Sequence, residues 1–117
     1  MDKIEDILQE LGIKRSYKAY SRLIVALTLA LEDEDRLRLI TKLYQEVGEK
    51  AGCSWKAVEH SIRTAINRVW KKGRKRLQEI ARYTLEKKPS VSDFMDILVT
   101  YLYRQDESEQ NKSPDRK

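Results

Sequence analysis

The sequence predicts an all-α fold of about six helices with a central helix-turn-helix. Apolar residues recur at spacings of three and four along most of the chain, as on the buried face of a helix. Alternation of apolar and polar residues, the pattern of a half-buried strand, is nearly absent. The only glycines stand where the helical patterns stop, as expected of C-terminal caps, at Gly12, Gly48, Gly52 and Gly73.

The N-terminal half of the chain predicts three helical segments. The first pattern begins at Ile4 and ends at Gly12, and the second is capped by Ser16 and runs to Leu31. An acidic cluster over 32–35 then opens a third pattern, because carboxylates at that end complement the helix dipole. We expect this third pattern to break before Tyr44 into a long helix and a short one.

The C-terminal half predicts three more helices. A Gly-containing turn over 51–54 leads to a helix that Ser54 caps and that runs to Lys72. A shorter helix over 75–85 follows, and Pro89 interrupts the pattern. Ser90 and Asp93 fit a capping box at the start of the last helix. We expect a single domain over 1–105 and a disordered polar tail over 106–117, where no apolar residue is left to bury.

Positive charge is concentrated in one segment. Residues 51–88 hold 11 Lys and Arg against 3 Asp and Glu, whereas residues 1–50 hold 9 against 10 and residues 89–117 hold 4 against 6. Such an uneven distribution predicts a polyanionic partner, and the alternative is a merely solvated charged face. Acidic flanks favour the polyanion.

The helix over 54–72 has two distinct faces. One face is an apolar stripe that must face a core, made of Trp55, Val58, Ile62, Ala65, Ile66 and Val69. The opposite face carries Lys56, His60, Arg63, Asn67 and Lys71. The segment holds five Lys or Arg residues and His60 against a single carboxylate, Glu59, and a polyanion would relieve their repulsion.

A short helix, a Gly-containing turn and a longer helix predict a helix-turn-helix that binds double-stranded DNA, with 54–72 in the major groove. The first turns of that helix reach base edges, so we expect base contacts from Lys56, Glu59, His60 and Arg63. Arg63 would read guanine, and Glu59 would read cytosine or orient an arginine. Contacts to the phosphate backbone are expected from Ser54, Asn67, Arg68, Lys71, Lys72, Arg74 and Lys75.

Other kinds of site have weak support in the sequence. The pair Asp33 and Asp35 is explained by its place at a helix start, and His60 and Cys53 lack the partners of a catalytic or metal site. We therefore expect no enzyme activity, no metal and no cofactor. The apolar registers of Trp55 and Trp70 favour core packing over stacking on bases. No run of about 18 apolar residues occurs, so no membrane span is expected, and the lone cysteine fits a reducing cytoplasm.

Residues 7 to about 104 resemble the C-terminal effector domain of the stage-zero sporulation response regulator family of endospore-forming bacteria. The resemblance is carried, in order, by ILQELGI, YKAYSRL, ITKLYQEVGEKAG, VEHSIRTAINRVW, ARYT and PSVSDFMDILVTYL. It implies a six-helix domain that regulates transcription by binding short DNA elements, as homodimers or tandem copies on repeated sites. It places base contacts around the Val58-Glu59 pair, at Glu59, His60 and Arg63. RNA polymerase is a candidate partner of a bacterial regulator of this class.

Two features depart from the family's main regulator. Arginines flank the Val-Glu pair there, whereas Ala57 and His60 stand at those places here, so we expect a different DNA sequence preference. The 117 residues also leave no room for the receiver domain, so the chain would be a stand-alone relative or a fragment. Two alternatives remain open: an RNA-binding protein, and an inhibitor or dimerisation partner of a full-length relative that uses Phe94, Tyr101 and Tyr103.

Overall fold

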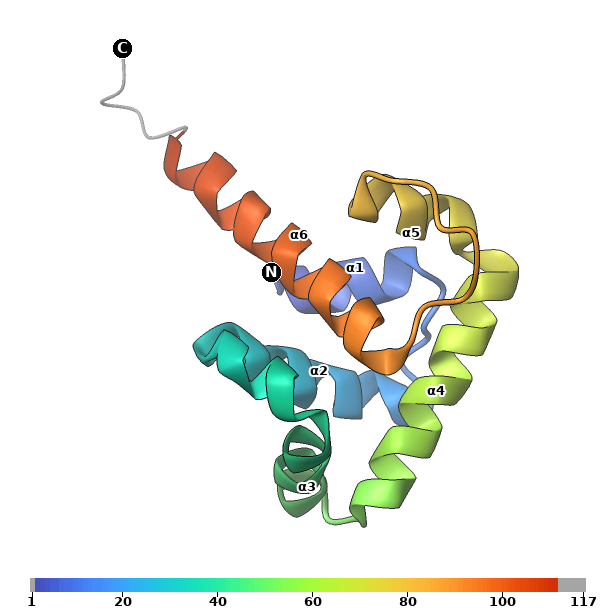
Figure 1. Ribbon diagram of the computed structural model, residues 1–117, viewed down its shortest axis with the longest axis vertical. Coiled ribbons are helices and arrows are strands. Elements are labelled where there is room, and N and C mark those ends of the chain that lie inside the picture. Colours follow the sequence, from blue (N-terminus) through green and yellow to red (C-terminus); the bar gives the residue numbers. More distant parts are fainter. Residues whose placement is uncertain (1, 112–117) are drawn as a thin grey trace.

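The computed structural model describes residues 2–111, and all regular structure in that range is helical (Figure 1). The elements in chain order are α1 (Lys3–Glu10), α2 (Lys18–Glu32), the 3-10 helix η1 (Glu34–Leu39), α3 (Ile40–Ala51), α4 (Trp55–Lys72), α5 (Arg74–Ala81) and α6 (Val91–Asn111). The prediction of an all-α fold with six α-helices is confirmed. Helices α3 and α4 with the short turn between them form the expected helix-turn-helix.

Helix α2 lies at the centre of the domain, because it packs against α1, α3, α4 and α6. Its buried face carries Leu23, Ala26, Leu27 and Ala30, each at most 1% exposed. The surrounding helices close a single core over these residues, to which α6 contributes the fully buried Phe94. Since α4 is anchored on this core along one face, its opposite face is held in a fixed orientation toward solvent.

Three predicted helix boundaries were wrong. Ser16 does not cap α2: residues 14–17 form a turn in which the Tyr17 N–H donates to the Lys14 carbonyl (3.0 Å), and Tyr17 takes the N-cap position. The third pattern breaks before Ile40 rather than before Tyr44, because η1 precedes α3. Helix α5 ends at Ala81, since Arg82 adopts a left-handed backbone (φ 68°) that the helix cannot continue through.

Gly48 was predicted to be a C-terminal cap and is not one, whereas Gly73 is the C-cap of α4, as predicted, but with a backbone that is not left-handed (φ −114°). Gly48 lies inside α3, and a Cβ atom there would come within 2.5 Å of the Cys53 carbonyl oxygen. At Gly73, where α4 passes into α5, a Cβ would come within 2.6 Å of the Leu11 carbonyl oxygen. Both positions therefore need glycine because another stretch of backbone approaches closely. Gly52, with φ +75°, is the left-handed cap that the sequence predicts.

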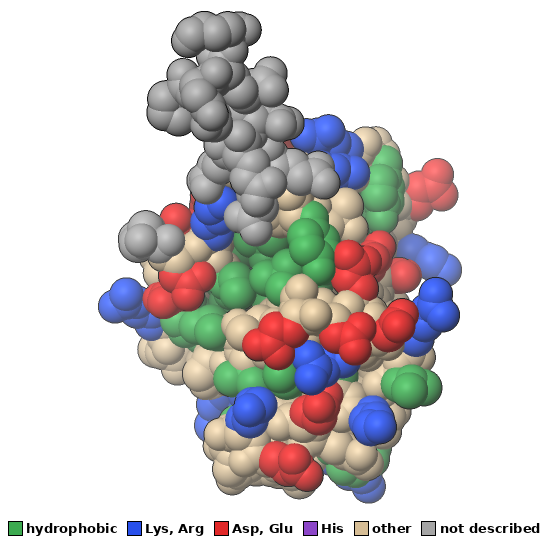
Figure 2. Space-filling model, turned by 90° about the vertical axis from the view of Figure 1, so that its left-hand side faces the viewer, with side chains coloured by type: hydrophobic (Ala, Val, Ile, Leu, Met, Phe, Trp, Pro, Cys, Tyr) green, Lys and Arg blue, Asp and Glu red, His purple; other side chains and the backbone are tan. Residues whose placement is uncertain are grey.

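The last helix extends past the predicted end of the domain. Helical backbone in α6 continues to Asn111, into the segment 106–117 that composition predicts to be disordered, and residues 112–117 lie outside the described residues. The domain boundary at 105 stays a prediction. On the face opposite α4, Figure 2 shows carboxylates interspersed with Lys and Arg around a hydrophobic strip. This mixed face carries no one-sided positive charge.

Candidate nucleic-acid interface

The turn between α3 and α4 is held by backbone hydrogen bonds to one residue. The N–H groups of Gly52 and Cys53 both donate to the Gly48 carbonyl, the second at 2.9 Å. Ser54 is the N-cap of α4, as predicted: its Oγ accepts from the Ala57 N–H (3.2 Å). The close approach at Gly48 thus fixes where α4 starts relative to α3.

The apolar stripe of α4 is buried as predicted, with one exception. Val58, Ile62, Ala65, Ile66 and Val69 are each at most 2% exposed.

Trp55 was predicted to lie in the same stripe, but its side chain is 36% exposed. Trp55 is the first residue of α4 and lies beyond the end of the core, so it packs on one neighbour, the Tyr44 ring (centroids 6.4 Å apart, rings 8° from parallel). Burial raises the pKa of the Tyr44 phenol above its usual value, and the Arg63 charge opposes this effect. The N-terminal end of α4 therefore carries a partly exposed aromatic pair.

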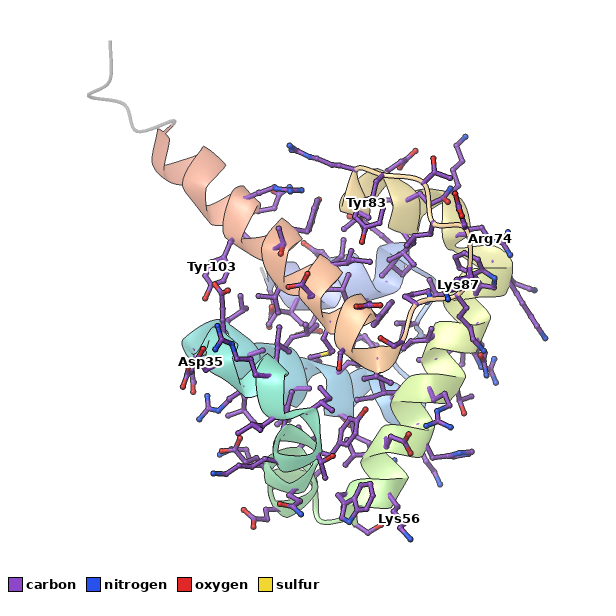
Figure 3. The ribbon with its side chains drawn as sticks, in the orientation of Figure 1. Asp35, Lys56, Arg74, Tyr83, Lys87 and Tyr103 are labelled. Atoms are coloured by element: carbon purple, nitrogen blue, oxygen red, sulfur yellow. The ribbon has the colours of Figure 1, made fainter. Side chains whose placement is uncertain are left out.

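The outward ridge of α4 lies along one edge of the molecule (Figure 1). The predicted base-contacting residues Lys56, His60 and Arg63 are exposed on it, and Lys56 stands at its N-terminal end (Figure 3). Ser54 is also exposed beside the free amides of the first turn. The four residues share the half of α4 that follows the turn, where a helix-turn-helix presents side chains to base edges.

Glu59 and Arg63 form an ion pair one helical turn apart. The Glu59 side chain is 25% exposed and the Arg63 side chain is 61% exposed, so the carboxylate lies beneath the guanidinium. Of the two roles expected for Glu59, orienting an arginine matches this geometry. At most four of the five guanidinium donors of Arg63 remain for another partner, because one already binds the Glu59 carboxylate.

The Lys and Arg residues among the predicted backbone contacts fall into two groups. Arg68 and Arg74 are exposed but lie against aromatic rings: Arg68 covers Tyr17 at 4.4 Å from the ring centroid, and Arg74 covers Trp70 at 3.9 Å. Lys71, Lys72 and Lys75 are exposed at the C-terminal end of α4 and the start of α5. The stacked arginines are therefore pre-positioned, whereas these lysines are not.

Asn67 has a partner that the sequence does not predict. It is half-buried in the middle of the ridge, and its Oδ1 accepts a hydrogen bond from the Lys88 ammonium. Lys88 and its neighbour Lys87 lie on the loop between α5 and α6, which runs beside α4 (Figure 3). Both lysines belong to the positive segment 51–88, so the charge count already included them in the predicted polyanion-binding region. Periodicity could not predict their position, because it does not show which loop lies against which helix.

One residue of the alternative protein-binding surface lies inside the core. Phe94 is fully buried, so α6 cannot offer it to a partner. Tyr101 and Tyr103 are half-buried, and their hydroxyls are engaged with the Arg76 guanidinium (3.3 Å) and the Leu31 carbonyl (2.8 Å). The predicted aromatic surface on α6 is therefore not assembled in this fold.

Over residues 2–111 no three His, Cys, Asp or Glu side chains are grouped so that they could hold a metal ion. None of the helices described is long and apolar enough to cross a membrane.

The domain is an all-α helix-turn-helix whose second helix presents a positively charged ridge. This architecture is typical of the class of DNA-binding domains. Residues 4–102 match the family described as "Sporulation initiation factor Spo0A C terminal", and the chain belongs to that family. The family is the DNA-binding regulatory domain of a sporulation regulator and not a catalytic domain, so the protein is a DNA-binding transcription regulator at the level of the family.

Proposed function

We propose that the protein regulates transcription by binding specific sequences of double-stranded DNA with the N-terminal half of α4 in the major groove. The observation that carries the proposal is the exposed ridge of Lys56, His60 and Arg63 on a helix whose other face is buried. A helix anchored in this way is already folded and oriented before it meets DNA, so binding need not order its backbone.

Arg63 is the residue to which we assign the main sequence discrimination. An arginine that donates two hydrogen bonds to guanine N7 and O6 discriminates against the wrong base by about 1–3 kcal/mol. Glu59 supports this role by restraining the guanidinium from the turn below. Lys56 and His60 are the remaining base-contacting residues, and Ser54 would meet a phosphate at the helix N-terminus.

The remaining contacts would go to the phosphate backbone, from Asn67, Arg68, Lys71, Lys72, Arg74 and Lys75. They would add affinity and salt dependence without sequence preference. We extend the proposal to binding as homodimers or tandem copies on repeated sites, to RNA polymerase as a partner, and to the bacterial cytoplasm as the place of action. Membership of a DNA-binding regulatory family supports the duplex as the primary partner.

Selection from a random duplex pool, followed by titration of the enriched duplex, tests the proposal. Arg63→Ala is expected to lose sequence preference at a cost of about 1–3 kcal/mol, while Lys72→Ala weakens all sequences about equally. Lys42→Ala is the matched control, because this exposed lysine lies among Asp33, Asp35 and Glu46, away from α4.

The outcomes separate the alternatives. If the wild-type protein enriches no motif, the sequence-specific proposal is wrong. Tighter binding to RNA than to duplex DNA would favour the RNA-binding alternative. An inhibitor or dimerisation partner would bind neither nucleic acid with a steep salt dependence.

A further inference from the structure

The two flanks of α4 differ in the charge that the helix itself provides. The flank toward α2 and the loop that precedes it borders a hollow that α4 lines with Arg68, Lys71 and Lys72, among other residues. The flank toward the α5–α6 loop borders a second hollow, which α4 lines with Glu59, Arg63 and Ile66. On this second flank the single cation that α4 contributes is Arg63, and Glu59 neutralises it.

A helix in the major groove needs cations on both flanks. The groove is about 12 Å wide and a helix with its side chains is about 10–12 Å across, so the phosphate backbones of both strands border the inserted helix. On the α2 side, the cations of α4 itself can neutralise the phosphates of the adjacent DNA strand. On the other side, the cations must come from elsewhere in the fold.

The α5–α6 loop supplies them. Lys87 and Lys88 are exposed and line the second hollow together with Glu59 and Arg63. The bond from the Lys88 ammonium to Asn67 Oδ1 holds the loop against the middle of the ridge. An ammonium has three donors, so this bond leaves two for a phosphate oxygen.

We propose that Lys87 and Lys88 bind the phosphate backbone of the DNA strand on the α6 side of α4. This inference rests on the proposed function, because it takes α4 to lie in the major groove. Lys88 contacts a phosphate while Asn67 fixes its direction, and Lys87 adds a second charge beside it. The recognition helix is thereby clamped between its own lysines on one flank and the loop lysines on the other.

The test is the salt dependence of duplex binding, measured by fluorescence anisotropy with both the enriched duplex and a random duplex. Each phosphate contact contributes about 0.9 to the slope of log affinity against log salt. The double variant Lys87→Ala/Lys88→Ala is therefore expected to lose roughly 1.8 of that slope. The affinity lost between about 50 and 200 mM salt then becomes roughly tenfold smaller than for the wild type. Lys42→Ala keeps the wild-type slope.

Two further variants separate the charge of Lys88 from its hydrogen bond to Asn67. Lys88→Arg preserves the charge and is expected to keep the slope, whereas Lys88→Gln keeps a hydrogen-bond donor without the charge and is expected to lose roughly 0.9 of the slope. An unchanged slope in the double variant overturns the inference, as does a wild-type slope in Lys88→Gln. Thermal melts followed by circular dichroism check that the exposed lysines are dispensable for folding.

Failure of the proposed function gives a different result. A wild-type protein that enriches no motif refutes sequence-specific recognition, yet the slopes on random duplex still test the two lysines, since phosphate contacts are independent of sequence. A wild-type protein that binds no duplex overturns both.

Discussion

Replacing Gly48 by alanine has two opposite effects on stability: it raises the helix propensity and it creates a steric clash. Gly48 is inside α3, where alanine has the higher helix propensity, by about 0.8–1.0 kcal/mol. If propensity alone acted, the variant would be more stable than the wild type. The added Cβ, however, would lie 2.5 Å from the Cys53 carbonyl oxygen, a backbone atom that cannot rotate away.

The steric effect is expected to be the larger one. Overpacking of a well-packed site costs about 1–3 kcal/mol, because backbone must shift. Because the clash is with a backbone atom at 2.5 Å, we take the upper part of that range, about 2–3 kcal/mol; after subtraction of the propensity gain, Gly48→Ala should lower the free energy of unfolding by about 1–2 kcal/mol. For a domain of this size the midpoint of thermal unfolding should fall by roughly 5–10 °C. The shifted turn would also move α4 relative to α3 and weaken specific DNA binding.

Urea and thermal unfolding followed at 222 nm provide the measurement, with a Gly→Asn exchange at two positions as the matched comparison. Gly52→Asn should be nearly tolerated, because asparagine adopts the left-handed backbone and no atom lies within 4 Å of the new Cβ. Gly48→Asn should destabilise at least as much as Gly48→Ala. A Gly48→Ala variant that melts at or above the wild-type temperature would refute the close-approach reasoning.

Three other predictions concern stability. Burial raises the pKa of Tyr44, so its phenol ionises more readily in the unfolded chain than in the folded one. The stabilising contribution of Tyr44 is therefore full below pH 10 and declines above it. Between pH 9 and 11, the urea midpoint of Tyr44→Phe should fall less than that of the wild type. Trp55→Ala should cost about 1 kcal/mol through loss of the stack on Tyr44, measured by urea unfolding, and equal stability would count against the stack. Arg76→Gln should cost less than about 1 kcal/mol, because the Arg76–Glu10 pair is partly exposed, and the difference should shrink in high salt.

Periodicity predicted the fold because each helix needs one buried face. It identified which residues of α4 share the stripe, and Val58 through Val69 are buried accordingly. It did not indicate how far along the axis the neighbouring helices extend, so Trp55 was placed in the core although it lies past its end. The glycines show the same limit: local rules predicted Gly73 as the C-terminal cap of α4, which it is, but not that it must be glycine because Leu11, distant in sequence, approaches it.

The candidate site was predictable where it is contiguous in the chain. Charge and spacing within 54–72 identified the ridge from one helix, since side-chain direction follows from helix geometry. The hydrogen bond between Lys88 and Asn67 depends on the path of the α5–α6 loop, which turns at Arg82 without a glycine to mark the turn. Counting charge showed that residues 87 and 88 belong to the positive segment, but only tertiary structure brings them beside α4.

The division of roles in this interface bears on the replacement of two arginines by Ala57 and His60. Ala57 is half-buried, and its carbonyl accepts from the guanidinium of Arg22 on α2 (3.2 Å), so the backbone at position 57 lies next to α2. In the proposed binding mode, the absence of an arginine at position 57 changes the surface that would read bases, and the lysines at the C-terminal end of α4 and on the α5–α6 loop remain in place. Phosphate contacts set most of the affinity and base contacts set the preference. We therefore expect the chain to differ from the family's main regulator in the sequence it prefers while keeping a comparable affinity for duplex DNA, which parallel titrations of both proteins on the enriched duplex would measure.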